Sequence, residues 1–185
     1  MNKRNATAWM MPLAFLFTGY TVVSPIARAA EAADSEHVSA LLSEAKTMAY
    51  QLKEDAQTME SFNRMNVAIE TQKATINQIR NHVNELGRQL TKLRDAKAEG
   101  SLWQRTAVDR ITPYLDELSG YTSAAIEHLA GRQHNPAEYQ DYLEANADYA
   151  SDLSAMISDF VDYGKTRQRV DRLQGKLEIN PKGER

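Results

Sequence analysis

The sequence predicts an all-α protein, an antiparallel up-down-up-down four-helix bundle with coiled-coil-like packing. The first observation is a stripe of residues spaced alternately three and four apart, nine of ten apolar: Phe62, Met65, Ile69, Gln72, Ile76, Ile79, Val83, Leu86, Leu90 and Leu93. Only partner helices can cover so long and narrow a stripe. The second observation is that the chain has only 8 glycines and lacks the alternating polar and apolar runs typical of strands.

The chain begins with the pattern of a secretory signal peptide, which we place at residues 1–29. Lys3 and Arg4 precede an uncharged, largely apolar stretch at 5–26, and an Ala-Arg-Ala sequence follows it. The apolar core is shorter than the roughly 20 residues of a membrane span, so a cleaved leader is favoured over the alternative, a membrane anchor. With 0 cysteines, the chain can form no disulfide and carry no cysteine-linked lipid. We expect an extracytoplasmic protein, periplasmic or secreted, with no stable membrane insertion after cleavage.

After a spacer at 30–34, the first helix is expected over about 35–60 with Asp34 or Ser35 as its N-cap. Its heptad positions hold Val38, Leu41, Ala45, Met48, Leu52 and Met59. The apolar phase jumps after the last of these, which predicts a turn near 61–64. One continuous bent helix is the alternative.

The second helix is predicted over about 64–98, before Gly100, because glycine commonly follows a helix C-terminus. The third helix is predicted over about 101–131, and its inward positions hold Val108, Ile111, Leu115, Leu118, Thr122, Ala125 and Leu129. Pro113 falls on the outer face of this helix, where it can bend the helix without entering the core.

An asparagine–proline pair at 135–136 predicts the start of the fourth helix, expected over about 136–177. Its seam is Tyr139, Leu143, Asn146, Ala150, Leu153, Ile157, Phe160 and Gly164. Beyond Gly164 the apolar phase shifts, so the last turns should project past the bundle. The bundle thus occupies 35–178, and a tail at 179–185 is expected to be disordered.

Short connections make neighbouring helices antiparallel, so the numbers of two facing residues add up to a constant. Matching the stripes gives 194 for the second and third helices and 268 for the third and fourth. On this register Gln72, Thr122 and Asn146 share one polar layer, with Leu52 of the first helix at the same height. Such a layer usually fixes the register through its own hydrogen bonds. A small polar cavity for water, an ion or a ligand is the alternative.

Aromatic side chains flank the seam at seven-residue spacing, Tyr114, Tyr121 and His128 on the third helix and Tyr142, Tyr149, Met156 and Tyr163 on the fourth. Facing pairs, such as Tyr121 with Tyr149, add up to 270. Rings at such an edge usually bury their carbons and leave the hydroxyl in water, without any ligand. The alternative is a groove for a flat aromatic or sugar ligand, with these candidate binding residues: Gln72, Thr122, Asn146, Tyr121, Tyr149 and His128.

We expect no metal and no cofactor. Di-iron bundles need inward Glu-x-x-His pairs, which the sequence lacks, and covalent haem attachment needs cysteine. His82 is expected to contact Glu44 across the first two helices. No catalytic residues are predicted, because there is no nucleophile beside a base, no phosphate-binding glycine loop and no inward carboxylate pair.

Charge is distributed unevenly along the chain. Removing 1–29 takes away three bases and no acids, so the net charge moves from −3 to −6, which argues against nucleic acid as a partner. Residues 133–164 contain seven acids and no Lys or Arg, whereas 165–185 contain seven bases and three acids. The acids should form a solvated outer face. The basic end could instead dock on an acidic or phosphate-bearing surface.

These observations favour an exported, non-enzymatic helical-bundle protein, either an interaction or a scaffold protein, with an unknown protein partner or itself as partner. The alternative is a small-ligand-binding or sensory bundle that uses the groove between the third and fourth helices.

Overall fold

The structure, a computed structural model, describes residues 33–131 and 135–179. The predicted signal peptide and all but the first residue of the predicted tail lie outside this part of the chain. Contacts divide the chain after Ala30, and everything described below belongs to the unit that begins at Glu31.

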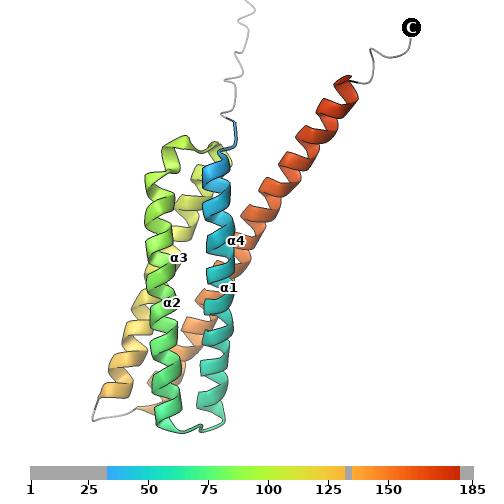
Figure 1. Cartoon of the computed structure of the whole chain (residues 1–185). Coiled ribbons are helices and arrows are strands. Elements are labelled where there is room, and N and C mark those ends of the chain that lie inside the picture. The colour runs from blue at the N-terminus through green and yellow to red at the C-terminus, as the bar shows by residue number, and fades with distance from the viewer. Residues whose placement is uncertain (1–32, 132–134, 180–185) are drawn as a thin grey trace, which may run out of the picture. The chain divides into compact units, whose positions relative to one another are not determined.

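Four helices form an up-down-up-down bundle, which confirms the predicted fold class (Figure 1). They are α1 (Glu36–Arg64), α2 (Ile69–Asp95), α3 (Leu102–Ala130) and α4 (Pro136–Ile179), with a 3₁₀ turn, η1 (Lys97–Glu99), before α3. Each helix packs against the next in the chain, and α4 also packs against α1. No described helix is long and apolar enough to cross a membrane.

The core is built mainly from the heptad positions that the sequence marks as apolar, but on α1 it also includes Leu42, and the predicted Met48 is only partly buried. Each helix contributes fully buried side chains to it, among them Leu42, Leu52, Ile76, Leu86, Ile111, Leu118, Leu143 and Leu153. Burying one such side chain stabilises the fold by about 1.5–3 kcal/mol. Pro113 lies within α3 and is exposed, on the outer face where the sequence placed it.

The turn between α1 and α2 lies at 65–68, so the prediction of 61–64 was wrong by four residues. Asn66 has a φ of 50°, the left-handed conformation that commonly ends a helix. The N–H of Val67 donates to the carbonyl of Phe62 at 3.0 Å, which closes the end of α1. Met65 is therefore 65% exposed and outside the core. The buried stripe of α2 begins only at Gln72.

The later turn changes which residues of α1 and α2 face each other. The hydrogen bonds of Gln78 with Asp55 and of Gln89 with Glu44 both join residues whose numbers add up to 133. The predicted contact of His82 with Glu44 is wrong, since His82 Nδ1 lies 2.7 Å from Asp55 Oδ2.

The same change of register applies to Leu52, which was predicted at the height of Gln72 from a constant of 124. With a constant of 133, its counterpart on α2 lies nine residues further along, about 13 Å away. The prediction for Leu52 was wrong as well.

The other helix ends follow the sequence closely. Ser35 caps α1 by accepting a hydrogen bond from the Val38 N–H, and α2 ends at Asp95, three residues early, because η1 follows it. Asn135 caps α4 by accepting from the N–H of Ala137 at 3.1 Å.

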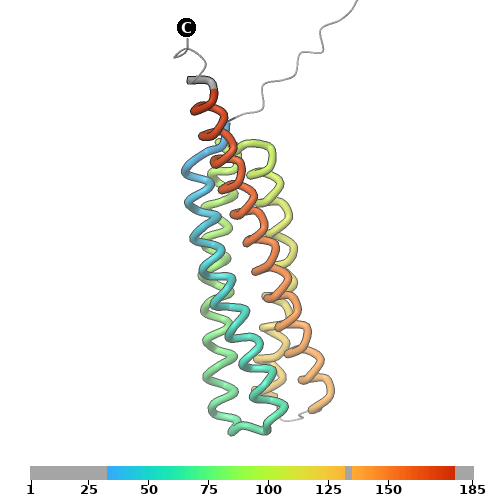
Figure 2. Tube along the Cα trace, turned by 90° about the vertical axis from the view of Figure 1, so that its right-hand side faces the viewer, coloured from blue at the N-terminus to red at the C-terminus, as the bar shows by residue number. Residues whose placement is uncertain are grey.

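α4 has 44 residues and is much longer than the other helices. Gly164 is the last of its buried positions, and the following turns extend past the end of the bundle (Figure 2). We call the described side chains at 165–177 the arm. The predicted projection of the last turns is confirmed.

Candidate functional site

Two of the predicted polar-layer residues, Thr122 of α3 and Asn146 of α4, are hydrogen-bonded to each other in the core. Asn146 Nδ2 donates to Thr122 Oγ1 at 3.1 Å, and the Thr122 hydroxyl donates to the Leu118 carbonyl at 2.8 Å. Both residues are at most 2% exposed. Their numbers add up to 268, as predicted. A pair that satisfies its own hydrogen bonds fits a register-fixing role better than a ligand site.

Gln72, the third predicted member, lies elsewhere. Its side-chain amide donates to the Val67 carbonyl at 2.8 Å, and its carbonyl accepts from the Tyr139 hydroxyl at 3.4 Å. Tyr139 is seven residues before Asn146 on α4, so Gln72 is about two helical turns nearer the α3–α4 connection. On the register of 268, Tyr139 is level with position 129 of α3, so facing residues of α2 and α3 add up to about 201 and the predicted sum of 194 was wrong by one heptad. The prediction of one three-residue layer was therefore wrong as well.

The predicted tyrosine face between α3 and α4 is present, and its register is confirmed. Tyr121 stacks on Tyr149 with ring centroids 5.4 Å apart, and Tyr114 meets Tyr149 edge to face at 6.1 Å. His128 packs edge to face on Tyr142 at 6.1 Å. These rings contact one another along the edge of the core and leave their outer sides exposed to solvent.

His128 has structural partners on both sides of its ring. Its Nε2 accepts a hydrogen bond from the Asn135 N–H at 3.0 Å, at the start of α4. Its ring also stacks on Tyr139 at 5.6 Å, next to Gln72. These contacts tie the end of α3 to the first turn of α4, so His128 and Gln72 belong to this connection rather than to the Thr122–Asn146 pair.

An open groove lies between α3 and α4, nearer to η1 than the stacked Tyr121 and Tyr149. We call it the α3–α4 groove; its volume is about 840 Å³. Tyr114 and Met156, a pair predicted to face each other, both line it, and so do Trp103, Arg110, Asp159, Phe160 and Tyr163. Aromatic carbon with a few charges at the rim suits an apolar or aromatic occupant.

The sequence did not point to Trp103, which organises the end of the bundle that holds η1. Its indole Nε1 donates to Asp34 Oδ1 at 2.7 Å, and its ring meets Tyr163 edge to face at 5.4 Å. The Arg167 guanidinium lies 3.6 Å from Asp34 Oδ2. Trp103 thereby joins the start of α1, the start of α3 and the base of the arm.

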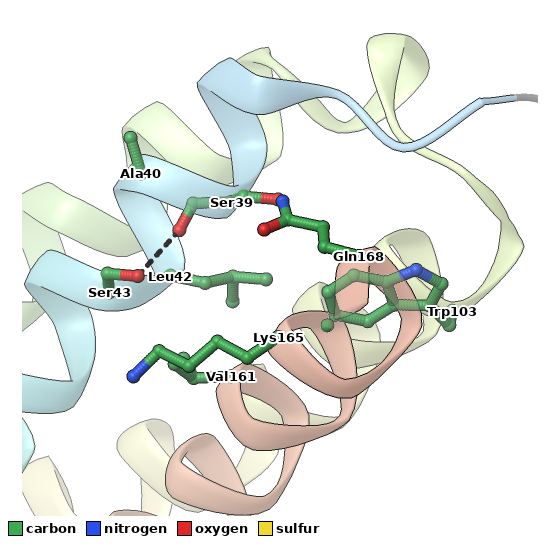
Figure 3. Close-up of a pocket in the computed structure, with 9 residues that line it drawn as sticks. Ser39, Ala40, Leu42, Ser43, Trp103, Val161, Lys165 and Gln168 are labelled. Atoms are coloured by element: carbon green, nitrogen blue, oxygen red, sulfur yellow. Dashed lines mark hydrogen bonds between the residues drawn. The ribbon is translucent and has the colours of Figure 1, made fainter. Parts of the chain in front are cut away.

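A second pocket, of about 190 Å³, lies on the other side of Trp103, between α1 and α4 (Figure 3). Leu42 and Ser39 line it from α1, and Val161, Lys165 and Gln168 line it from α4. This volume would admit only a few waters or a very small molecule.

Gln104 is a second residue that the sequence analysis missed. It is 0% exposed, and its amide nitrogen donates to the Ser35 carbonyl at 2.8 Å and to Ser39 Oγ at 2.9 Å. Its carbonyl accepts from the N–H groups of Ser35 and Ser101, both at 2.9 Å. The Ser-x-x-Gln spacing of Ser101 and Gln104 is that of a capping box, and this is the sequence signal that could have drawn attention to Gln104.

Three tyrosines of α4 have hydroxyl groups with raised pKa values. A hydrogen bond to Glu138, at 2.6 Å, raises the pKa of the Tyr142 hydroxyl. Burial raises the pKa of Tyr139 and of Tyr149. Tyrosines with raised pKa values do not act as bases near neutral pH, so they offer aromatic surface and hydroxyl donors.

The arm exposes apolar side chains to solvent. Val170, Leu173 and Leu177 are 45%, 51% and 70% exposed, respectively. We call these three residues the arm stripe; their spacing of three and four places them on one face of the helix. Basic residues surround them: Lys165, Arg167, Arg169, Arg172 and Lys176.

Among the described residues, no group of three or more His, Cys, Asp or Glu side chains could hold a metal ion. Comparisons with protein-family models, curated proteins and solved structures found no match for this chain.

Proposed function

We propose that this protein is an exported, non-enzymatic interaction protein that works outside the cytoplasm and uses the arm as its contact surface. The observation that carries the proposal is the arm stripe. Three large apolar side chains on one helical face are left in water, whereas the large apolar residues of the same helix before the arm are buried or partly buried, except for Tyr163 at 48% exposed. Contiguous apolar surface rimmed by charge is typical of a protein–protein contact.

The ionisable residues of the bundle support a binding role rather than a catalytic one. His37 contacts Glu99 at 3.2 Å, His82 contacts Asp55, and His128 accepts from a backbone N–H. Each of these histidines is engaged in linking two segments of the bundle. A general base needs a ring nitrogen directed at a substrate site, which none of these contacts provides.

Site-specific photo-crosslinking in the producing organism tests the proposal. A photoreactive phenylalanine analogue in place of Val170 should yield a discrete cross-linked product, and Leu177→Asp in the same chain should abolish it. The matched control places the analogue at Tyr50, which is 55% exposed on α1 and distant from the arm stripe in sequence. Equal cross-linking from positions 170 and 50, or none from position 170, would contradict the proposal.

The α3–α4 groove favours a second candidate function, the binding of a flat aromatic or sugar ligand. Its support is a groove of about 840 Å³ lined by the rings of Trp103, Tyr114, Phe160 and Tyr163. A ligand found by screening should lose at least tenfold in affinity with Tyr114→Ala, while Tyr121→Ala, outside the groove lining, leaves binding unchanged. The reverse result would move the site to the stacked Tyr121 and Tyr149.

A further inference from the structure

We propose that the occupant of the arm stripe is a second copy of this chain, paired so that each arm lies in the α3–α4 groove of the other copy. This inference rests on the proposed function and names its partner. In the paired form, the α4 helices of the two copies run antiparallel across a two-fold axis. The two bundles then lie at opposite ends of the paired segment.

The groove and the arm stripe belong to one continuous face of α4. Met156 and Tyr163 line the groove, and Val170 and Leu177 follow them at the same seven-residue interval. Residues seven apart lie on nearly the same side of a helix. The face from Met156 to Leu177 is therefore one strip about 32 Å long, half of it in the groove and half on the arm.

The spacing of the strip matches itself under two-fold rotation. From the middle outward, the arm stripe reads Val170, Leu173, Leu177, with intervals of three and four. In the other direction, the groove residues Tyr163, Phe160 and Met156 have the same intervals. Val170 then pairs with Tyr163, Leu173 with Phe160 and Leu177 with Met156 of the other copy. The numbers of each pair add up to 333. The two-fold axis then passes between Thr166 and Arg167.

The charges of the strip are complementary under the same rotation. On α4 the groove is lined by two acids, Asp152 and Asp159. The described side chains of the arm hold five bases and one acid: Lys165, Arg167, Arg169, Arg172, Lys176 and Asp171. On the register of 333, Arg172 of one copy is within two residues of the level of Asp159 of the other. Lys176 comes within two residues of the level of Asp159, about 3 Å, which a lysine side chain spans easily.

The charges also disfavour other arrangements. Two arms packed only on each other would oppose base to base, which repels. Arg110 lines the groove from α3, so the basic arm should lie nearer the α4 wall with its aspartates. An anionic membrane would attract the arm but would repel the exposed acids at 138–162 of the same helix.

The test is the mass of the purified full-length protein, measured by sedimentation equilibrium between 1 and 200 µM. We expect a monomer–dimer equilibrium whose dissociation constant rises at least tenfold with Leu173→Asp and rises with salt concentration. Met65→Asp is the matched control, because Met65 is exposed and lies at the opposite end of the bundle. Lys176→Glu and Asp159→Lys should each weaken the dimer, and the two together should restore it.

Disulfide trapping tests the register itself. The chain has 0 cysteines, so Thr166→Cys introduces a single thiol next to the proposed two-fold axis. Under mild oxidation it should form a linked dimer much faster than Thr91→Cys, an exposed threonine on α2.

Three results would overturn the inference: a monomer at 200 µM, equal cross-linking from both cysteines, or arm-dependent binding to anionic vesicles by a protein that stays monomeric. The first two leave the proposed function standing if position 170 still cross-links to a different protein in cells. Absence of any product from position 170 contradicts the proposed function itself.

Discussion

Gly164 of α4 lies directly against the indole of Trp103, so closely that a Cβ at position 164 would come within 2.7 Å of the ring atom Cη2. The indole is held from its other side by Asp34 through a hydrogen bond of 2.7 Å. Glycine at this position is what lets α4 pass the end of α3 before it leaves the bundle as the arm.

Replacing this glycine should therefore be costly. We expect Gly164→Ala to destabilise the protein by about 1–3 kcal/mol, because the indole must move away from Asp34 to make room. Tryptophan fluorescence during urea unfolding measures both effects. Gly120→Ala is the control: nothing lies within 4 Å of a Cβ there, so alanine should stabilise α3 by up to about 1 kcal/mol. Equal effects of the two substitutions would refute the close contact.

Gln104 should be among the most sensitive polar residues of the protein. Gln104→Ala leaves the N–H groups of Ser35 and of the buried Ser101 without their partner, and we expect a loss of about 2–4 kcal/mol in the free energy of unfolding. Gln78→Ala, on the exposed side of α2, should change stability by less than about 0.5 kcal/mol. Urea denaturation compares them, and similar losses would show that the Gln104 bonds contribute little.

Thr122 and Asn146 should be energetically coupled. In a double-mutant cycle with Thr122→Val and Asn146→Leu, we expect a coupling energy of about 0.5–3 kcal/mol, since Thr122→Val leaves the buried Asn146 amide without its partner only while Asn146 is present. Gln72→Leu combined with Asn146→Leu should be additive within about 0.5 kcal/mol, because Gln72 bonds to Tyr139 instead. Strong coupling of Gln72 with Asn146 would restore the three-residue layer.

Stability should fall at alkaline pH. The pKa values of Tyr139, Tyr142 and Tyr149 are raised from 10.0, so the folded state favours the neutral phenols. Their contribution is fully present below the unfolded pKa and is lost as the pH rises through the folded pKa values. Urea unfolding at intervals from pH 8 to above 11 measures the loss. Tyr139→Phe should make the decline shallower, whereas the exposed Tyr50→Phe should leave it as it is.

The turn after α1 should depend on Asn66. Because Asn66 has a φ of 50°, Asn66→Ala should cost about 1 kcal/mol and Asn66→Gly should cost nothing or stabilise. Asn84→Ala, at an exposed position inside α2, should have the opposite sign, since alanine is the better helix former. The midpoint of thermal unfolding should therefore fall with Asn66→Ala and rise with Asn84→Ala. A neutral Asn66→Ala would show that the turn tolerates other conformations.

The register of α3 and α4 could be predicted from sequence because the start of each helix is marked by a cap. Ser101 fixes the start of α3, and the pair at 135–136 fixes the start of α4. With both starts known, the contact of Tyr121 with Tyr149 follows from addition. The turn after α1 has no such mark: Asn66 lies inside an apolar sequence, and the apolar spacing of Phe62 and Met65 suited either helix.

The contacts of Gln104 and Trp103 could not be predicted in this way. Both residues bond to the start of α1, 65 to 69 positions away, and α1 runs parallel to α3 on the opposite corner of the bundle. Matching antiparallel neighbours gives no information on contacts between parallel, diagonal helices. The α3–α4 groove lies between the two helices for which a ligand groove was predicted, but the candidate residues Tyr121 and Tyr149 do not line it.

The packing of α4 on α1 also determines when the chain can finish folding. The contact of Lys46 with Asp162 joins residues 116 positions apart, so it must wait until nearly all of the chain is available. Until then, Leu42 and its neighbours on α1 lack the side chains of α4 that pack on them, and only the first three helices can pack together. Synthesis from the N-terminus therefore keeps the polypeptide incompletely folded to a late stage, and the last helix completes the fold.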